Sequence, residues 1–89
     1  MKEYSYLTYL QIKIRLVKDM PIVMAPHNSP LKIVRIAADD KLKKHLESLG
    51  ITLNGEITVL SSSGGSVVCK IKDGRVALDR ELSTKIFVV

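Results

Sequence analysis

Residues 39–55 restrict the possible folds of this chain more than any other stretch, because they predict one short helix that ends in a turn. Leu42, Leu46 and Leu49 recur at helical spacing, so they form one apolar stripe that can pack on the rest of the protein. Asp39 and Asp40, at the start of this stretch, can accept hydrogen bonds from the free N–H groups of the first turn, and their charge suits the positive end of the helix dipole. We therefore expect an amphipathic helix that begins at these aspartates and packs through its leucines.

The end of this helix is also specified locally. Gly50 occupies the position where a residue with positive φ commonly follows the last turn, and Ile51 supplies the apolar residue that folds back on it. The expected contact joins Ile51 to Leu46. Because the chain after the helix is typical of short strands, we expect a single helix of this kind in an otherwise all-β chain.

Alternation of apolar and polar residues predicts about five strands from residue 31 onward. They are residues 31–36, residues 56–60, the run with Val67, Cys69 and Ile71 on one face, residues 75–78 and residues 86–89. Residues 79–83 predict a short helical turn before the last strand. Antiparallel strands of this length, joined by tight turns, favour a small barrel.

Turns that contain glycine separate these strands. Asp73 and Gly74 lie between two alternating runs and predict a two-residue type I′ hairpin, in which both central residues need positive φ. The serine- and glycine-rich residues 61–65 predict a flexible hairpin loop. Asn54 and Gly55 predict a further turn after the helix.

The first 19 residues form a separate part of the pattern. Apolar and polar side chains alternate through residues 4–17, which is typical of a strand. Met20 and Pro21 end this run, because proline interrupts a strand ladder. We interpret residues 1–19 as an N-terminal extension that can form an extra strand or a contact between copies of the chain. Residues 20–89 are then the folded domain.

The composition argues against several classes of protein. The chain carries a net charge of +5, spread along its length without the dense basic stripe that nucleic-acid binding usually needs. No apolar run approaches about 18 residues, so none predicts insertion into a membrane. Lys13 and Arg15 interrupt the N-terminal apolar run, which argues against a signal peptide. A single cysteine excludes an intramolecular disulfide, and together these features favour a cytoplasmic protein.

The residues that could do chemistry are scattered along the chain. Catalysis by a nucleophile also needs a base and an orienting group, and neither histidine lies in such a motif. Fe(II) favours clustered imidazole and carboxylate ligands, and the candidates do not cluster in sequence. These candidates are His27, His45, Cys69, Asp39 and Asp40. We therefore predict no catalytic residue, no metal ligand and no cofactor, and we interpret the cysteine as a small core residue.

The order of these elements resembles the FeoA family, small SH3-like barrel proteins of bacterial ferrous iron uptake. The matching residues are Met20-Pro21, residues 31–36, Leu42, residues 46–51, Gly55, Gly64-Gly65, Ala77-Leu78, Ile86 and Val88. The resemblance covers roughly residues 20–89. Two turns depart from the family pattern, because Ser66 stands where a proline is usual and the loop of residues 26–30 lacks the usual glycine.

The resemblance implies an SH3-like β-barrel of five to six strands, with one α-helix after the first barrel strand. It also implies a non-enzymatic accessory protein that binds a FeoB-type transporter, a membrane protein with a GTP-binding cytoplasmic domain. The helix and the adjoining barrel cleft would form the docking surface, with Leu42, Lys44, His45 and Leu49 at or near it. Two alternatives stay open: a metal-responsive regulatory module, since iron-dependent repressors contain the same barrel, and a small nucleic-acid-binding barrel.

Overall fold

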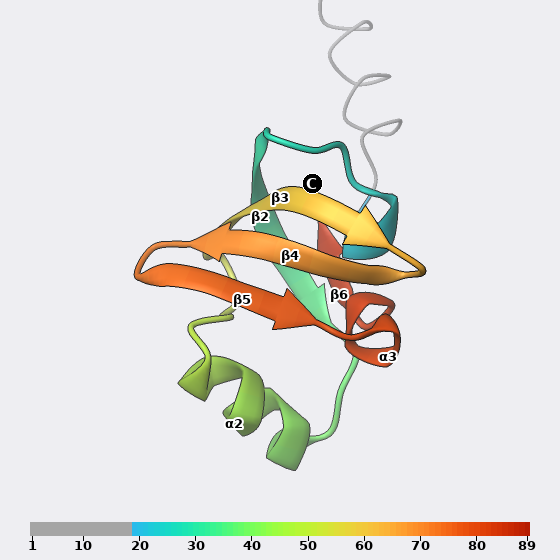
Figure 1. Cartoon of the computed structure of the whole chain (residues 1–89). Helices are drawn as coiled ribbons and strands as arrows, with labels where there is room; N and C mark the ends of the chain where they lie inside the picture. Colours follow the sequence, from blue (N-terminus) through green and yellow to red (C-terminus); the bar gives the residue numbers. More distant parts are fainter. Residues whose placement is uncertain (1–18) are drawn as a thin grey trace, which may run out of the picture.

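The structure, a computed structural model, describes residues 19–89, and strands dominate this part of the chain (Figure 1). Its elements in chain order are β1 (Met20–Pro21), η1 (Ile22–Met24), β2 (Pro30–Ile36), α2 (Asp40–Ser48), β3 (Glu56–Ser63), β4 (Ser66–Ile71), β5 (Gly74–Leu78), α3 (Arg80–Ser83) and β6 (Ile86–Val88). The predicted extra strand and the contact between copies fall in the N-terminal extension, outside the described residues, and stay predictions.

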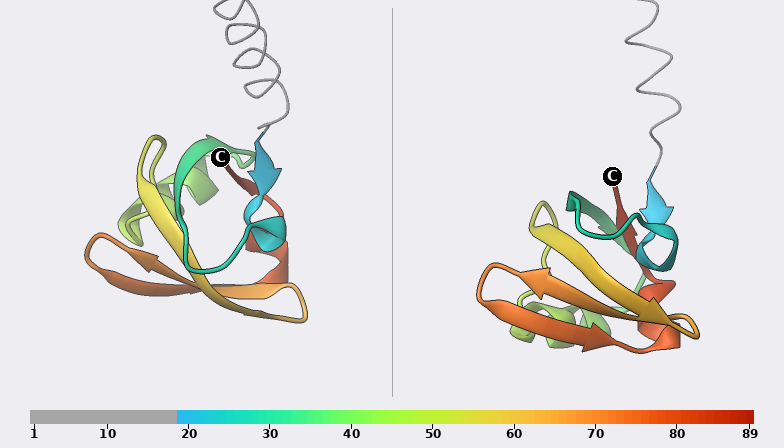
Figure 2. Two further views of the ribbon diagram at one scale, coloured as in Figure 1. Left: turned by 90° about the horizontal axis from the view of Figure 1, so that it is seen from above. Right: turned by 45° about the horizontal axis from the view of Figure 1, so that its top comes forward.

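The six strands form one antiparallel sheet in the order β1-β6-β2-β3-β4-β5. Seen from above, the sheet curls around a central core (Figure 2, left). Shifts of register between Val59 and Ser61, and between Ile33 and Arg35, help the long strands to bend. The predicted all-β, SH3-like fold with one helix after the first long strand is confirmed.

An aliphatic core fills this barrel. Its fully buried side chains come from every strand from β2 to β6, and from η1, α2 and the segment after α2. They include Ile22, Ile33, Leu46, Ile51, Ile57, Val59, Val67, Leu78, Ile86 and Val88. None of the helices within residues 19–89 has the length and apolarity needed to span a bilayer.

Helix α2 begins and ends as its sequence predicts. The Asp39 carboxylate accepts a hydrogen bond from the N–H of Leu42 at 2.8 Å, which caps the first turn. At the other end Gly50 has a φ of 93°, and the N–H of Ile51 donates to the carbonyl of Leu46 at 2.9 Å. This is the hydrogen bond of a Schellman motif, so Gly50 turns the chain from the helix into the core.

The two hairpins differ from their predicted forms. Ser61–Ser63 were expected in a loop, yet they continue β3 and pair with β4, where Ser63 lies opposite Ser66. The turn is therefore reduced to Gly64 and Gly65, which both have positive φ. Serine tolerates the exposed side of a strand when its partner strand is held by buried residues.

The β4–β5 hairpin also corrects a prediction. Ile71 pairs with Gly74, so Lys72 and Asp73 are the two central residues of the turn. Positive φ occurs at Gly74 and not at Asp73, which rules out the predicted type I′ turn with Asp73 and Gly74 at its centre. The glycine instead follows the turn as the first residue of β5.

Candidate functional site

Three of the four residues predicted to bind a partner lie on α2 and the fourth, Leu49, caps its C-terminal end; the structure divides the four into two pairs. Leu42 and Leu49 are half-buried and pack against the core beside Leu46. Lys44 and His45 are exposed on the outer side of the same helix. The leucines therefore serve first to attach the helix, whereas Lys44 and His45 are free to meet a partner.

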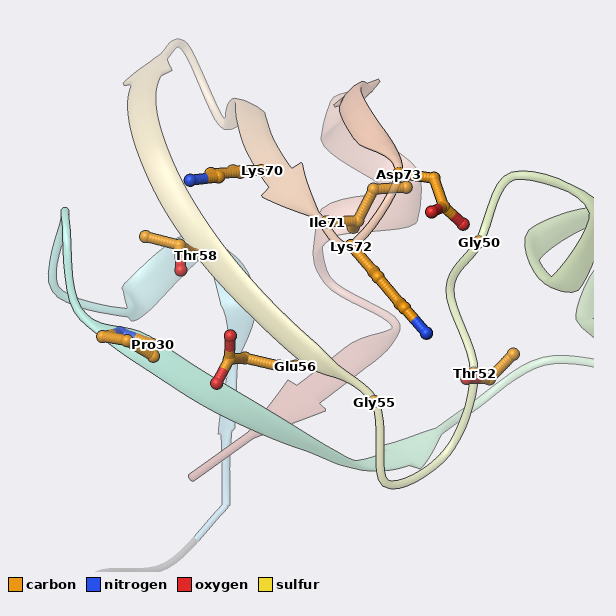
Figure 3. A pocket seen from close by; sticks show the side chains of 10 residues that line it. All are labelled: Pro30, Gly50, Thr52, Gly55, Glu56, Thr58, Lys70, Ile71, Lys72 and Asp73. Carbon is orange, nitrogen blue, oxygen red and sulfur yellow. The ribbon is translucent and has the colours of Figure 1, made fainter.

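An open groove of about 720 Å³ lies beside the C-terminal end of α2 (Figure 3). It is lined by the segment after α2, the start of β3, the first residue of β2 and the β4–β5 hairpin. The lining residues are Pro30, Gly50, Thr52, Gly55, Glu56, Thr58, Lys70, Ile71, Lys72 and Asp73. None of the four predicted α2 residues lines the groove, so the helix surface and the groove are adjoining but separate features.

Gly50 determines how closely the end of α2 approaches the β4–β5 hairpin. A Cβ atom built on Gly50 would lie 2.7 Å from Cδ1 of Ile71, closer than side-chain atoms can pack. Because its φ is also positive, this position requires glycine for two independent reasons. The absence of a side chain here lets Ile71 pack under the helix end and forms one wall of the groove.

The charged side chains of the groove come mainly from the β4–β5 hairpin. In Figure 3, Lys72 and Asp73 extend from the turn toward the segment that contains Gly50. Lys70 and Glu56 lie farther along the groove, on β4 and β3. A groove with lysines and carboxylates at its rim, and with no histidine or cysteine in its lining, can bind a polar partner through charge pairing.

The resemblance implied a barrel cleft adjoining the helix, but sequence reasoning named none of the residues that line this groove. Its walls come from three stretches that are distant along the chain, namely Pro30, residues 50–58 and residues 70–73. The registers place Pro30 opposite Thr58, and Thr58 opposite Lys70, so these three residues form one row across the outer face. The available sequence signal was local: Lys70, Lys72 and Asp73 gather around one turn. That signal indicates a charged hairpin, but not what lies beside it.

The candidate metal ligands are not brought together. Nε2 of His27 lies 3.1 Å from Oγ of Ser62, and His45 is exposed on α2. Within residues 19–89 no group of three or more histidine, cysteine or acidic side chains is placed to hold a metal ion. Cys69 is fully buried on the inner face of β4, as its pattern predicted, and burial raises the pKa of its thiol to about 11. The thiol therefore stays protonated at neutral pH, which disfavours metal binding.

Residues 20–89 match the family model described as FeoA domain. No curated protein matches the chain.

Among solved structures, a crystal structure of an iron uptake regulatory protein (FeoA) is 21% identical, with a TM-score of 0.72. The match covers 80% of this chain and 96% of that one. A FeoA-like protein from Clostridium acetobutylicum is 16% identical with a TM-score of 0.69, over 82% of this chain and 87% of that one. A manganese-dependent transcriptional repressor in complex with manganese is 24% identical with a TM-score of 0.70. That match covers 80% of this chain but only 36% of the repressor, so the likeness concerns the shared fold of one part.

Proposed function

This chain belongs to the FeoA domain family, and on that premise we propose that it is a non-enzymatic cytoplasmic accessory protein that binds a FeoB-type ferrous iron transporter and modulates uptake. The observation that carries the proposal is the family match, which extends over the whole barrel, residues 20–89. The match also covers 96% of a protein described as an iron uptake regulatory protein, so the likeness extends over nearly all of that protein.

The exposed side of α2 is the surface that we propose for this contact. Lys44 and His45 are exposed there, and Leu42 and Leu49 at the helix margin are still partly accessible. Transient protein interfaces combine exposed polar or charged side chains with apolar contacts, and this side of the helix offers both. We expect Lys44 to guide association and the leucine margin to supply the apolar contact.

The test is binding of the full chain to the isolated cytoplasmic domain of a FeoB-type transporter, measured by calorimetry or biolayer interferometry. Lys44→Glu should weaken binding by about fivefold, the effect of removing one favourable surface charge pair and adding a repulsive one. Lys72→Glu, which makes the same charge change in the groove, is the matched control. Absence of binding by folded protein would refute the proposal, and equal losses in both variants would refute its location on α2.

A metal-responsive regulatory module is the second candidate, because the barrel has the fold of part of a manganese-dependent repressor. No ligand cluster within residues 19–89 supports it. Anaerobic calorimetry with Fe(II) and Mn(II) separates the two functions, since a saturable heat at stoichiometric metal would favour the module. The nucleic-acid-binding alternative predicts a complex that weakens steeply with salt, and titration of oligonucleotides at two salt concentrations tests it.

A further inference from the structure

Strand β5 forms an open edge of the sheet. It is the last strand in the sheet order, and within the described residues β4 is its sole strand partner. Gly74, Arg75 and Ala77 are exposed, and a Cβ atom built on Gly74 would meet nothing within 4 Å. Both views in Figure 2 show β5 at the rim of the sheet. An exposed edge of this kind presents backbone groups to which another strand can pair.

The register identifies which backbone groups face outward. Ile71 and Gly74 close the two-residue turn and therefore form a hydrogen-bonded pair of the ladder. In an antiparallel ladder such pairs alternate with non-hydrogen-bonded ones, which places Arg75 and Ala77 at non-hydrogen-bonded positions. Their N–H and C=O groups point away from β4, so the free side offers two donors and two acceptors.

The side chains next to this edge carry an unusual pair of like charges. Lys70 on β4 lies directly opposite Arg75 on β5, and both side chains are exposed on the outer face. Non-hydrogen-bonded pairs bring side chains closest, and like charges in direct opposition destabilise a sheet. Glu56 and Asp73 line the groove beside Lys70, yet within residues 19–89 neither cation forms an ion pair with any carboxylate.

The next row along the two strands is apolar. Val68 lies opposite Ala77, and both are exposed on the same outer face as the two cations. An added strand places residues i and i+2 on one face, so one residue would lie near Arg75 and the next but one near Ala77. The surface therefore fits an acidic residue and an apolar residue two positions apart, in an order set by the direction of the added strand.

From this geometry we propose that the β5 edge binds an extended acidic segment of a partner protein by strand addition. The added strand pairs with the outward groups of Arg75 and Ala77, while its carboxylates neutralise the cations of Lys70 and Arg75. Main-chain pairing supplies affinity, and the alternation of charged and apolar rows supplies specificity.

Two other occupants fit the same edge less well. The alternating residues 4–17 of a second copy carry Lys13 and Arg15, which would add like charge beside Lys70 and Arg75. A nucleic acid would satisfy the two cations, but it has no backbone N–H and C=O array to pair with the strand edge. An acidic peptide strand satisfies both features at once.

The probe is the fluorescently labelled peptide Ser-Glu-Thr-Val-Ser-Glu-Thr-Val, titrated into the full chain at low salt. We expect saturable binding with a dissociation constant below about 1 mM. Amide hydrogen exchange should slow at Arg75 and Ala77 and change little at Val76, whose N–H already faces β4. The peptide in which lysine replaces glutamate is the control and should not bind. Absence of binding by the acidic peptide, or protection confined to α2, would overturn the proposal.

Two double variants separate charge contacts at the β5 edge from attraction to the net charge of the chain. Lys70→Glu combined with Arg75→Glu should weaken the acidic peptide by at least about tenfold and should create binding of the lysine peptide. Lys41→Glu combined with Lys43→Glu makes the same change of net charge on exposed positions of α2 and should leave the affinity within about twofold. If both double variants lose binding equally, attraction to net charge explains it and the site is refuted.

Ala77→Pro removes one outward N–H and should leave the β4 ladder intact, because proline is tolerated at such edge positions. A folded Ala77→Pro protein that binds the acidic peptide as tightly as the parent would refute strand addition. Tighter binding of an oligonucleotide, or of a synthetic peptide of residues 3–18, would assign the edge to another occupant and also refute the proposal. None of these experiments uses the transporter, so a failure here would not refute the proposed function, and a failure of the proposed function would not refute this site.

Discussion

The two faces of β4 differ in burial, because alternate side chains of the strand point into the core and out to solvent. Val67 and Cys69 on the inner face are 1% and 0% exposed and lie in the barrel core. Val68 and Lys70 on the outer face are exposed, and Lys70 opposes a second cation, Arg75. The side chains of the inner face are packed in the core, whereas the outer face carries two opposed cations that add nothing to this packing.

This difference separates residues that specify the fold from residues available for binding. The core below the inner face extends to the C-terminal end of α2, where Leu46 and Ile51 are fully buried. There the lack of a side chain on Gly50 lets Ile71 approach closely. Substitutions there should lower stability through packing and strain. Substitutions on the outer face should change stability little, and one of them should raise it.

Leu46→Ala should give the largest effect. The side chain is fully buried, so its removal leaves a cavity, and we expect unfolding to become easier by about 3 kcal/mol. Urea denaturation followed by circular dichroism measures this loss. His45→Ala, at the exposed neighbouring position, is the control and should change stability by less than about 0.5 kcal/mol. A loss under about 1 kcal/mol for Leu46→Ala would contradict the assigned core.

The second effect concerns pH and the inner face of β4. Burial raises the pKa of the Cys69 thiol from 9.0 to about 11, so between these values the unfolded state binds fewer protons than the folded state. The thiol's contribution to stability is therefore complete below pH 9 and is lost as pH rises toward 11, at up to about 1.4 kcal/mol per pH unit. Thermal unfolding across this range, compared with Cys69→Ala, isolates the effect. Parallel curves for the two proteins would show that the thiol is not desolvated.

Gly50→Ala should destabilise the protein by about 1–2 kcal/mol, because it adds both a positive-φ penalty and a clash with Cδ1 of Ile71. Gly64→Ala is the matched control, since Gly64 also has positive φ but a Cβ there meets nothing. Ile71→Val deletes the clashing atom, so the double variant with Gly50→Ala should be more stable than the sum of the two single losses predicts. Strict additivity in this cycle would mean that the helix end and the hairpin do not touch.

Asp39→Ala should cost about 1 kcal/mol, because it removes the cap of the first turn of α2. Asp79 caps α3 in the same way, accepting from the N–H of Leu82 at 2.8 Å. Chemical denaturation of both alanine variants compares the two helices, and Asp→Asn, which keeps a capping oxygen, should recover most of the loss at either site. Failure of asparagine to recover stability would point to the charge and not to the hydrogen bond.

Lys70→Glu should have the smallest effect and the opposite sign. Replacing a repulsive cross-strand pair by an attractive one should stabilise the folded state by about 0.5 kcal/mol. The gain should shrink in high salt, because both groups are exposed and therefore screened. Lys32→Glu, an exposed reversal on β2 opposite Glu56, should destabilise slightly and is a useful contrast. A loss of stability in Lys70→Glu would show that the two cations do not repel each other.

Local rules predicted the helix correctly, since its signals act within a few residues. The aspartate cap, the leucine stripe and the glycine stop each depend on neighbours at most four or five positions away. The alternation of buried and exposed residues in β3 and β4 was equally readable, because a strand exposes alternate side chains whatever its partner. The short strand β1 and the turn η1 were missed, because two or three residues form no pattern.

The turn between β4 and β5 shows where local rules fail. A hairpin centred on Asp73 and Gly74 would keep the same side chains facing the core, so the alternating pattern cannot distinguish it from the observed register. The observed register places Leu78 opposite Val67 and leaves Asp79 free to cap α3. These contacts involve parts of the chain that a two-residue turn rule does not consider.

The amino-acid sequence by itself therefore determined the helix with both its ends, the buried faces of the strands and the family of the barrel. The tertiary structure alone decided the register of the β4–β5 hairpin, the groove beside Gly50 and the opposition of Lys70 and Arg75. The physical reason is range: capping and alternation act between near neighbours, whereas a groove or an opposed pair of charges exists only after packing has aligned distant strands.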